Sequence, residues 1–303
     1  MIRGMIKTLA KIIAAGVIAA VALVGGALWL GDRKVDRRID VRVVPVPFAK
    51  PTPQVLQLGK YLFESRGCSE CHGRDGAGRV VIDEPGGIYV RSPDISPAST
   101  SMVANYTEAD WVRSIRHGVD PAGRALLIMP SEDYNRMNDG DLAALVAYIR
   151  SLPPGRGTLG EVRLPKVVRV MYGVGAFKDG YEKIDHRLPP AQPVAVGVTP
   201  EHGGYVATMC AGCHGPAYSG GRIPASPPDW PPASNLTPGE GSVMQRYPTV
   251  EAFTGMLRSG KRPDGGQVSK VMPFETLANL NDTDVRALYA FLNTLPPRKT
   301  GEK

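Results

Sequence analysis

Cys68-Ser69-Glu70-Cys71-His72 and Cys210-Ala211-Gly212-Cys213-His214 are two copies of one pentapeptide pattern, Cys-x-x-Cys-His. Together they contain all four cysteines of the 303-residue chain. This pattern is the attachment signature of c-type haem. Its two thiols can form thioethers to the vinyl groups of one porphyrin, and the adjoining histidine can ligate the iron. The sequence therefore predicts two covalently bound haems.

Other chemistry is open to a single Cys-x-x-Cys pair, which can be a redox dithiol or half of a zinc site. Two such pairs could supply the four ligands that zinc requires. Zinc or a disulfide would leave unexplained the histidine that directly follows each pair, His72 and His214. Haem accounts for both cysteines and the histidine of each motif, so it is the favoured interpretation.

A second landmark is repeated after each haem motif. Met129-Pro130 follows His72, and Met272-Pro273 follows His214, at separations that differ by a single position. From there the two halves stay in constant register, as shown by Asn138-Asp139-Gly140-Asp141 against Asn281-Asp282-Thr283-Asp284 and by Leu152-Pro153-Pro154 against Leu295-Pro296-Pro297. The chain contains an internal duplication.

The repeated methionines are the candidates for the sixth iron ligand. Methionine sulfur favours the reduced iron, raises its potential and occupies the position that a substrate would need. In the register set by the Met-Pro pairs, the other methionines that could be considered have no methionine partner: Met102, Met137, Met244 and Met256. We therefore predict His72 with Met129 on one iron and His214 with Met272 on the other.

The remaining histidines and one pair of arginines are weaker candidates. His117 matches Ser259 in the second half and is expected to face solvent at a helix end. His186 lies in the connector beside Arg187, and His202 lies just before the shortened first helix of the second half. None of the three is favoured as an iron ligand. Arg116 and Arg258 match between the halves, and they could pair with haem propionates or simply be solvated.

Helical periodicity closes each half. Apolar residues recur at offsets 0, 3, 4, 7 and 10, in Leu142, Leu145, Val146, Ile149 and Leu152 and again in Val285, Leu288, Tyr289, Leu292 and Leu295. An asparagine three residues before an aspartate can cap the first turn of each helix, and a proline pair ends it.

Further helices are expected earlier in each half. The segment 54–65 predicts a helix with a buried face of Leu58, Leu62 and Phe63, and 108–117 predicts another that corresponds to 250–259. Gly59, with Gly203 or Gly204, would let the first and last helices cross closely. No convincing alternating strand pattern is found, so the fold class predicted is all-α.

The N-terminus predicts a membrane anchor. Arg3, Lys7 and Lys11 precede nineteen uncharged residues, 12–30, which just span a bilayer as a helix. A cleaved signal peptide is the alternative. Because haem is attached outside the bacterial cytoplasmic membrane, residues 1–11 are expected in the cytoplasm and the haem domains in the periplasm.

Charge is concentrated beside this stretch. Of the net charge of +7, residues 1–50 contribute +6, from nine Lys/Arg against three Asp/Glu. This fits contact with anionic lipid headgroups and argues against nucleic acid as a partner.

The domain organisation follows from these landmarks. We expect a juxtamembrane linker at 31–50, two tandem domains at 51–156 and 198–298, and a short tail at 299–303. The connector 157–197 is rich in Pro, Gly and Val, and the apolar run 167–177 favours a wrapped connector over a disordered spacer.

These motifs resemble the class I cytochrome c family, and Pro93-Asp94-Ile95-Ser96-Pro97 against Ser234-Asn235-Leu236-Thr237-Pro238 adds to the likeness. Within the family, the chain looks most like the multihaem cytochrome c subunits of membrane-bound bacterial dehydrogenases for alcohols and gluconate. Those subunits usually carry three haem domains and a C-terminal membrane segment, whereas this chain has two motifs and an N-terminal span. The resemblance implies helical domains, periplasmic location and no catalysis by the chain itself.

The functional expectation is a membrane-anchored diheme electron carrier between a dehydrogenase or respiratory donor and a terminal acceptor. Its partners would be redox proteins such as a dehydrogenase subunit, a quinol oxidoreductase or a terminal oxidase, with no small-molecule substrate. A diheme peroxidase-like enzyme is one alternative, although it would need one iron with an open or displaceable sixth position. A tethering subunit of a dehydrogenase complex is the other.

Overall fold

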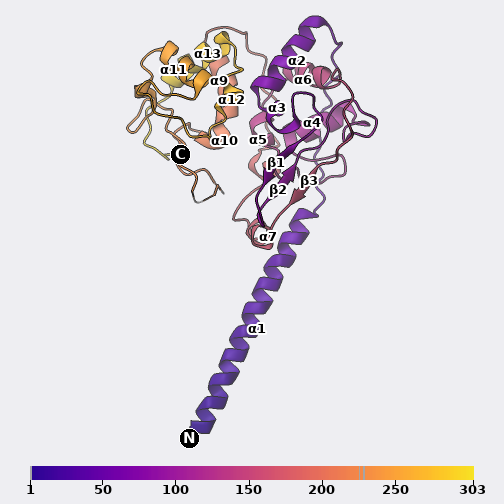
Figure 1. Ribbon diagram of the computed structural model, residues 1–303, viewed down its shortest axis with the longest axis vertical. Helices are drawn as coiled ribbons and strands as arrows, with labels where there is room; N and C mark the ends of the chain where they lie inside the picture. The colour runs from indigo at the N-terminus through magenta and orange to yellow at the C-terminus, as the bar shows by residue number, and fades with distance from the viewer. Residues whose placement is uncertain (1, 225, 228) are drawn as a thin grey trace.

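The computed structural model describes residues 2–224, 226, 227 and 229–303 (Figure 1). A long N-terminal helix, α1 (Ile2–Val35), projects away from two helical bodies that lie side by side. Helices dominate both bodies, which confirms the all-α expectation apart from one small sheet.

The main helices of the two duplicated halves correspond one to one. The first domain contains α2 (Pro53–Ser65), α3 (Cys68–His72), α4 (Glu108–His117), α5 (Ser131–Tyr134) and α6 (Asp139–Ile149). The second contains α9 (Pro200–Ala207), η1 (Thr208–Cys210), α10 (Ala211–His214), η2 (Met244–Arg246), α11 (Val250–Ser259), α12 (Phe274–Leu277) and α13 (Asp282–Thr294). The predicted helices at 108–117 and 250–259 are confirmed to the residue.

Glycine sets how closely the first and last helices of each domain approach. A Cβ added to Gly59 in α2 would lie 2.1 Å from the carbonyl oxygen of Ala144 in α6. A Cβ on Gly203 in α9 would lie 1.9 Å from the carbonyl oxygen of Ala287 in α13. The predicted close crossing is confirmed, and Gly203 is the residue at the crossing point.

The asparagine caps are also confirmed. Asn138 Oδ1 accepts a hydrogen bond from the backbone N–H of Asp141 (2.8 Å), and Asn281 Oδ1 accepts one from Asp284 (2.8 Å). Each bond satisfies a backbone donor that the first helical turn leaves free. The two closing helices therefore start in the same way.

Each domain has its own apolar core. Leu62 and Phe63 of α2 are 2% and 0% exposed and pack with residues of α4 and α6, as predicted. The prediction for Leu58 is wrong, because its side chain is 39% exposed. Leu58 lies one turn before Leu62, at the edge of the buried face of α2, which contains Gly59, Leu62 and Phe63.

A three-stranded antiparallel sheet is the main departure from the all-α prediction. It consists of β1 (Val80–Asp83), β2 (Tyr89–Arg91) and β3 (Glu161–Arg163), in that order. The strands are only three or four residues long, β1 carries an irregularity, and β3 is exposed throughout. Such strands are too short and too exposed to show an alternating apolar pattern.

The connector is structured over much of its length. It supplies β3 and then forms α7 (Lys166–Gly173) and α8 (Gly180–Lys183). Asp179, fully buried, accepts a hydrogen bond from Arg37 (2.7 Å), and Glu182 pairs with Lys34 (2.9 Å). These ion pairs attach the connector to the end of α1.

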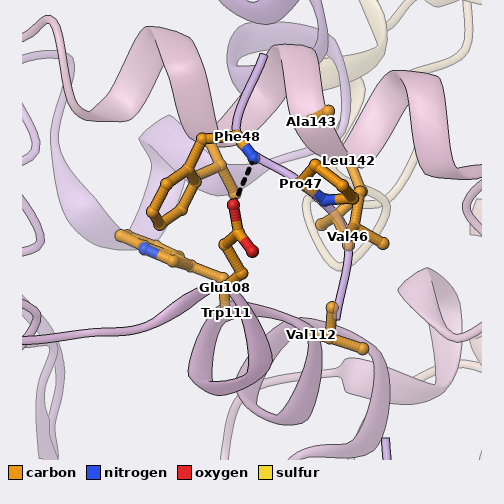
Figure 2. Close-up of a pocket in the computed structure, with 9 residues that line it drawn as sticks. Val46, Pro47, Phe48, Glu108, Trp111, Val112, Leu142 and Ala143 are labelled. Carbon is orange, nitrogen blue, oxygen red and sulfur yellow. Dashed lines mark hydrogen bonds between the residues drawn. The ribbon is translucent and has the colours of Figure 1, made fainter. Parts of the chain in front are cut away.

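Part of the segment 31–50, predicted as a juxtamembrane linker, also packs against the first domain. Figure 2 shows Val46, Pro47 and Phe48 lying between α4 and α6, where Glu108 Oε1 accepts a hydrogen bond from the Phe48 N–H (2.8 Å). Arg150 stacks over the Phe48 ring at 3.8 Å. The recess that remains is small, about 190 Å³, so this segment covers the core and does not form a ligand site.

His117 is not solvent-facing as predicted, since it is only 9% exposed. Its Nδ1 lies 2.8 Å from Nδ1 of His186 in the connector, and Nε2 of His186 lies 2.8 Å from the Tyr181 carbonyl oxygen. The carbonyl requires a proton on His186 Nε2, so His186 Nδ1 is the acceptor and His117 donates. The connector therefore covers the C-terminal end of α4.

This contact predicts a pH dependence of stability. Burial, together with His186, Arg116 and Arg113, lowers the pKa of His117 to about 4. Between about pH 6.5 and pH 4 the unfolded chain binds a proton there that the native chain does not, so the free energy of unfolding falls as the pH falls. His117→Asn keeps a donor near the Nδ1 position and should flatten this dependence by up to about one proton. Urea unfolding at a series of pH values measures it, and an unchanged slope in the variant would contradict the assignment.

Candidate haem sites and the contact between the domains

Each Cys-x-x-Cys-His segment forms a single helical turn that ends at a matched glycine. Gly73 and Gly215, which follow His72 and His214, have φ of 77° and 78°. This is the left-handed region that side chains with a Cβ rarely adopt. The chain thus turns sharply away just after each histidine, and the two thiols and the imidazole of one motif stay on one short segment.

The histidines are oriented by backbone carbonyls. Nδ1–H of His72 donates to the Pro93 carbonyl oxygen (3.1 Å), and Nδ1–H of His214 donates to that of Ser234 (2.7 Å). A bond of this kind fixes the tautomer and leaves Nε2 available to a metal. Burial lowers the pKa of both imidazoles, which keeps them neutral as ligation requires.

A large cavity lies beside the first motif. It encloses about 1300 Å³ of space, part of it open to solvent, and Cys68, Cys71 and His72 line it together with Met129. Its other walls are mainly apolar: Val81, Val90, Ile95, Val103, Trp111, Ile115, Leu126, Leu127, Ile128, Leu145 and Ile149. A wide apolar cavity with two thiols and one neutral imidazole at its wall fits a covalently attached porphyrin.

The two Met-Pro segments have the same local structure. Pro130 and Pro273 have φ of −78° in both copies and ψ of 62° and 59°. The carbonyl oxygen of Met129 accepts a bond from Ser131 N–H (2.8 Å), and that of Met272 accepts one from Phe274 N–H (2.8 Å). Met272 packs at the edge of the second core. The structure therefore places the two methionines at equivalent points, and their ligation of iron stays a prediction.

Met102 and Met244 require a separate check, because they are as far apart in the sequence as the matching cysteines of the two motifs. The backbone pairs them differently. Met102 N–H donates to the Asp94 carbonyl oxygen, whereas Val243 N–H donates to that of Asn235, the counterpart of Asp94. Val243 is thus the equivalent of Met102, and these two methionines do not occupy equivalent positions.

Arg116 and Arg258 hold backbone carbonyls. Arg116 is 3% exposed, donates to the Met137 carbonyl oxygen (2.5 Å) and pairs with Asp139 (2.8 Å), so it is not solvated. Arg258 donates to the Ala278 carbonyl and lies 3.2 Å from Asp282. Both tie the middle helix of a domain to the start of its last helix.

Duplicated residues contact one another across the domain interface. Tyr61 Oη–H of the first domain donates to Asp284 Oδ2 of the second (2.6 Å), and Tyr205 Oη–H of the second donates to Asp141 Oδ2 of the first (2.6 Å). Each tyrosine and each aspartate is the repeat counterpart of the other. The two domains therefore meet as the subunits of a twofold-symmetric dimer do, with the same patch on both sides.

The haem motifs take part in the same interface. Glu70, inside the first motif, accepts a hydrogen bond from Thr276 of α12 (2.7 Å). Asp133 of α5, the counterpart of Thr276, accepts one from the backbone N–H of Gly212 inside the second motif. A Cβ on Gly212 would lie 2.7 Å from Asp133 Oδ1, so the Asp133 carboxylate lies directly against this motif. Each attachment segment thus contacts the other domain.

A buried charge breaks the symmetry. Arg66, with 9% of its side chain exposed, pairs with Asp284 (3.1 Å), and Nε2 of the buried His202 lies 2.8 Å from the other oxygen of that carboxylate. Burial would raise the pKa of Asp284, but Arg66 and hydrogen bonds from Tyr61 and His202 hold it below its usual value. The corresponding Asp141 is bonded to Tyr205. His202 therefore helps to position Asp284, the carboxylate that Tyr61 contacts across the domain interface.

Sequence reasoning missed this interface entirely. The usable signal was that Tyr61 and Tyr205, like Asp141 and Asp284, occupy matched positions in the duplication. Matching shows that residues are equivalent, but it does not show that they face the partner domain.

Comparison with known proteins agrees with the geometry. The family model for cytochrome c matches residues 56–153 and 204–296, and each match contains one haem motif. The cytochrome subunit of fructose dehydrogenase from Gluconobacter japonicus is 28% identical over 282 residues, 84% of this chain and 55% of that protein. The cytochrome c subunit of quinone-type alcohol dehydrogenase from Komagataeibacter europaeus is 26% identical over 80% of this chain and 56% of its own length.

A relative of similar length is also found. The diheme cytochrome c-type protein of Cereibacter sphaeroides is 26% identical over 304 residues, 91% of this chain and 96% of that protein. The chain spans about half the length of the dehydrogenase subunits that it matches. The two family matches and the diheme relative assign two covalent haems c to the chain. The chain belongs to the cytochrome c family.

Proposed function

We propose that the chain is a membrane-anchored diheme electron carrier that passes single electrons between a dehydrogenase or respiratory donor and a terminal acceptor. The observation that carries this proposal is the placement of His72 and Met129 in the wall of one apolar cavity, with Met272 at the equivalent point of the second domain. With histidine and methionine as axial ligands, each iron has no open position, which favours electron transfer over peroxidase chemistry.

The domain interface supports electron transfer within the chain. Because Glu70 and Gly212 of the two attachment segments each contact the opposite domain, both segments that would carry the haems lie toward the same interface. Holding both redox centres in one chain replaces a diffusional encounter with a fixed one.

The proposed partners follow from the relatives. Cytochrome subunits of fructose, alcohol and gluconate dehydrogenases are among them, as is the CcoP subunit of a cbb3-type oxidase from Helicobacter pylori. We place this chain as a non-catalytic subunit beside a dehydrogenase, and its anchor would also tether that partner to the membrane.

The membrane location rests on α1. Residues 3–35 are long and apolar enough to cross a membrane, and the most apolar window of this helix is not covered by the rest of the protein. Figure 1 shows α1 leaving the haem domains on one side only. We propose that it spans the bacterial cytoplasmic membrane and that both haem domains lie in the periplasm, where haem is attached.

The test is purification of the holoprotein from detergent-solubilised membranes of its own cells. The expected result is a stoichiometric dehydrogenase whose substrate reduces both haems anaerobically. A chain that purifies alone, is reduced by no copurifying enzyme and consumes peroxide catalytically would overturn the proposal in favour of the peroxidase-like alternative.

Tyr61→Phe combined with Tyr205→Phe should loosen the contact between the domains. Each change removes a hydrogen bond to a partly buried carboxylate, worth about 1.5–3 kcal/mol. We expect faster proteolysis in the connector and slower electron equilibration between the haems after flash reduction. Tyr289→Phe is the matched control, because the Tyr289 hydroxyl donates to the Tyr247 carbonyl within one domain (2.9 Å). Equal rates in the double variant and the control would contradict the role of the interface.

A further inference from the structure

The connector helix α7 lies against the outer end of the proposed membrane span. A Cβ on Gly173 would lie 2.4 Å from the Gly31 nitrogen, and a Cβ on Gly31 would lie 2.3 Å from the Arg169 carbonyl oxygen, so the two backbones touch. Ala27 and Leu28 are also partly covered. Because the apolar stretch ends at Leu30, α7 is level with the boundary where a spanning helix leaves the hydrocarbon.

One side of α7 carries an apolar stripe that the protein does not cover. Val167, Met171 and Val174 follow one another at i, i+4 and i+7 and are 64%, 43% and 59% exposed. Tyr172 is fully buried, stacks on Phe177, and packs against α1 through Lys34. The apolar run 167–177, expected to pack against the protein, does so through one face only.

The charges around this stripe are suited to a lipid surface. Lys166 and Lys178 lie at either end of the stripe. Two of the neighbouring acids are paired within the protein, Asp32 with Arg169 (2.9 Å) and Asp179 with Arg37. An apolar stripe flanked by lysines is the composition of helices that lie in the interface of membranes with anionic lipids.

The position of α7 relative to α1 is fixed by several contacts. Lys34 Nζ donates to the Tyr172 carbonyl oxygen (3.0 Å), lies 4.1 Å from the centre of the Tyr172 ring, and pairs with Glu182 of α8. Arg37 bonds both Asp179 and Glu182. The depth of α1 in a bilayer therefore also sets the depth of α7.

We propose that α7 is a second membrane contact that lies in the plane of the outer leaflet, with Val167, Met171 and Val174 at the boundary between headgroups and acyl chains. The inference rests on the proposed anchoring role of α1. Its occupant is the lipid bilayer, because α7 packs against the outer end of the proposed span and lysines flank its exposed stripe. With a spanning helix and an interfacial helix joined rigidly, the first haem domain has a fixed tilt and height above the membrane.

The test uses the full-length holoprotein in proteoliposomes of phosphatidylethanolamine and phosphatidylglycerol. All four native cysteines are held in thioethers, so a cysteine introduced by Val167→Cys or Met171→Cys is the only free thiol and can carry one NBD fluorophore. Lipids with a shallow or a deep doxyl quencher then report its depth. Val17→Cys in the span and Asn293→Cys on the exposed side of α13 are the controls.

We expect the shallow quencher to reduce the fluorescence at 167 and 171 about twofold relative to unquenched liposomes, because an interfacial helix buries its apolar face only about 5–10 Å into the leaflet. Position 17 should respond to the deep quencher and position 293 to neither. Quenching at 17 with none at 167 and 171 would overturn the inference and leave the anchor intact. Absence of quenching at 17 as well would mean that the proposed anchor itself is wrong. Labels at 167 and 171 that resist both lipid and aqueous quenchers in native membranes would show a protein partner on the stripe and would also overturn it.

Discussion

Met129→Ala is expected to lower the midpoint potential of the first haem by on the order of 0.2 V, a fraction of the roughly 0.8 V over which axial ligands set haem potentials. Methionine stabilises the ferrous iron, and its loss leaves water or a weaker ligand in that position. The iron should become high-spin, lose its sulfur-to-iron charge-transfer band and bind cyanide. Spectroelectrochemical titration of the two haems measures the shift, and Met272→Ala should do the same to the second haem.

Met102→Ala is the matched control, because Met102 lines the same cavity but has Val243 as its structural counterpart. It should leave the first haem low-spin and its potential nearly unchanged. A titration in which Met129→Ala moves neither midpoint, or in which Met102→Ala gives the larger shift, would overturn the ligand assignment.

Gly59→Ala and Gly203→Ala are expected to have the largest effects on stability. The new methyl group would lie about 2 Å from a backbone carbonyl oxygen of the facing helix, and a carbonyl cannot rotate away as a side chain can. The first and last helices must separate, which costs about 3 kcal/mol, the upper end of overpacking penalties. Urea unfolding of the holoprotein, followed by circular dichroism, measures the change.

Gly255→Ala provides the control. Gly255 is an exposed helical residue of α11, and a Cβ there would meet nothing within 4 Å. Alanine should stabilise the helix by up to about 1 kcal/mol. If Gly59→Ala or Gly203→Ala were as stable as the parent protein, the close crossing of the helices would be wrong.

The features that the sequence predicted are those encoded within a short stretch. The haem motifs, the capping asparagines Asn138 and Asn281, and the helices at 108–117 and 250–259 depend on residues that lie close together in the chain. The duplication strengthened each of these predictions, because two copies carried the same pattern. The glycine at the helix crossing could be predicted for the same reason.

The features that were missed depend on residues far apart in sequence. β3 (Glu161–Arg163) pairs with β2 (Tyr89–Arg91), which lies far from it in the sequence. Strands of three residues are also too short to show a periodic apolar pattern. His117 is buried because the connector returns over the end of α4, which the sequence of α4 cannot reveal. The domain interface is likewise formed by Tyr61 and Asp284, 223 residues apart. A local sequence pattern predicts individual helices and strands, whereas these contacts depend on how the helices and strands pack together.

The central claim is that two covalent haems are each held between histidine and methionine, so that the chain carries electrons and binds no substrate at iron. Low-temperature electron paramagnetic resonance of the oxidised holoprotein, with spins counted against protein concentration, tests it most directly. The account predicts two low-spin ferric irons in each chain and no high-spin signal. A single low-spin iron per chain, or one low-spin and one stable high-spin iron, would contradict it.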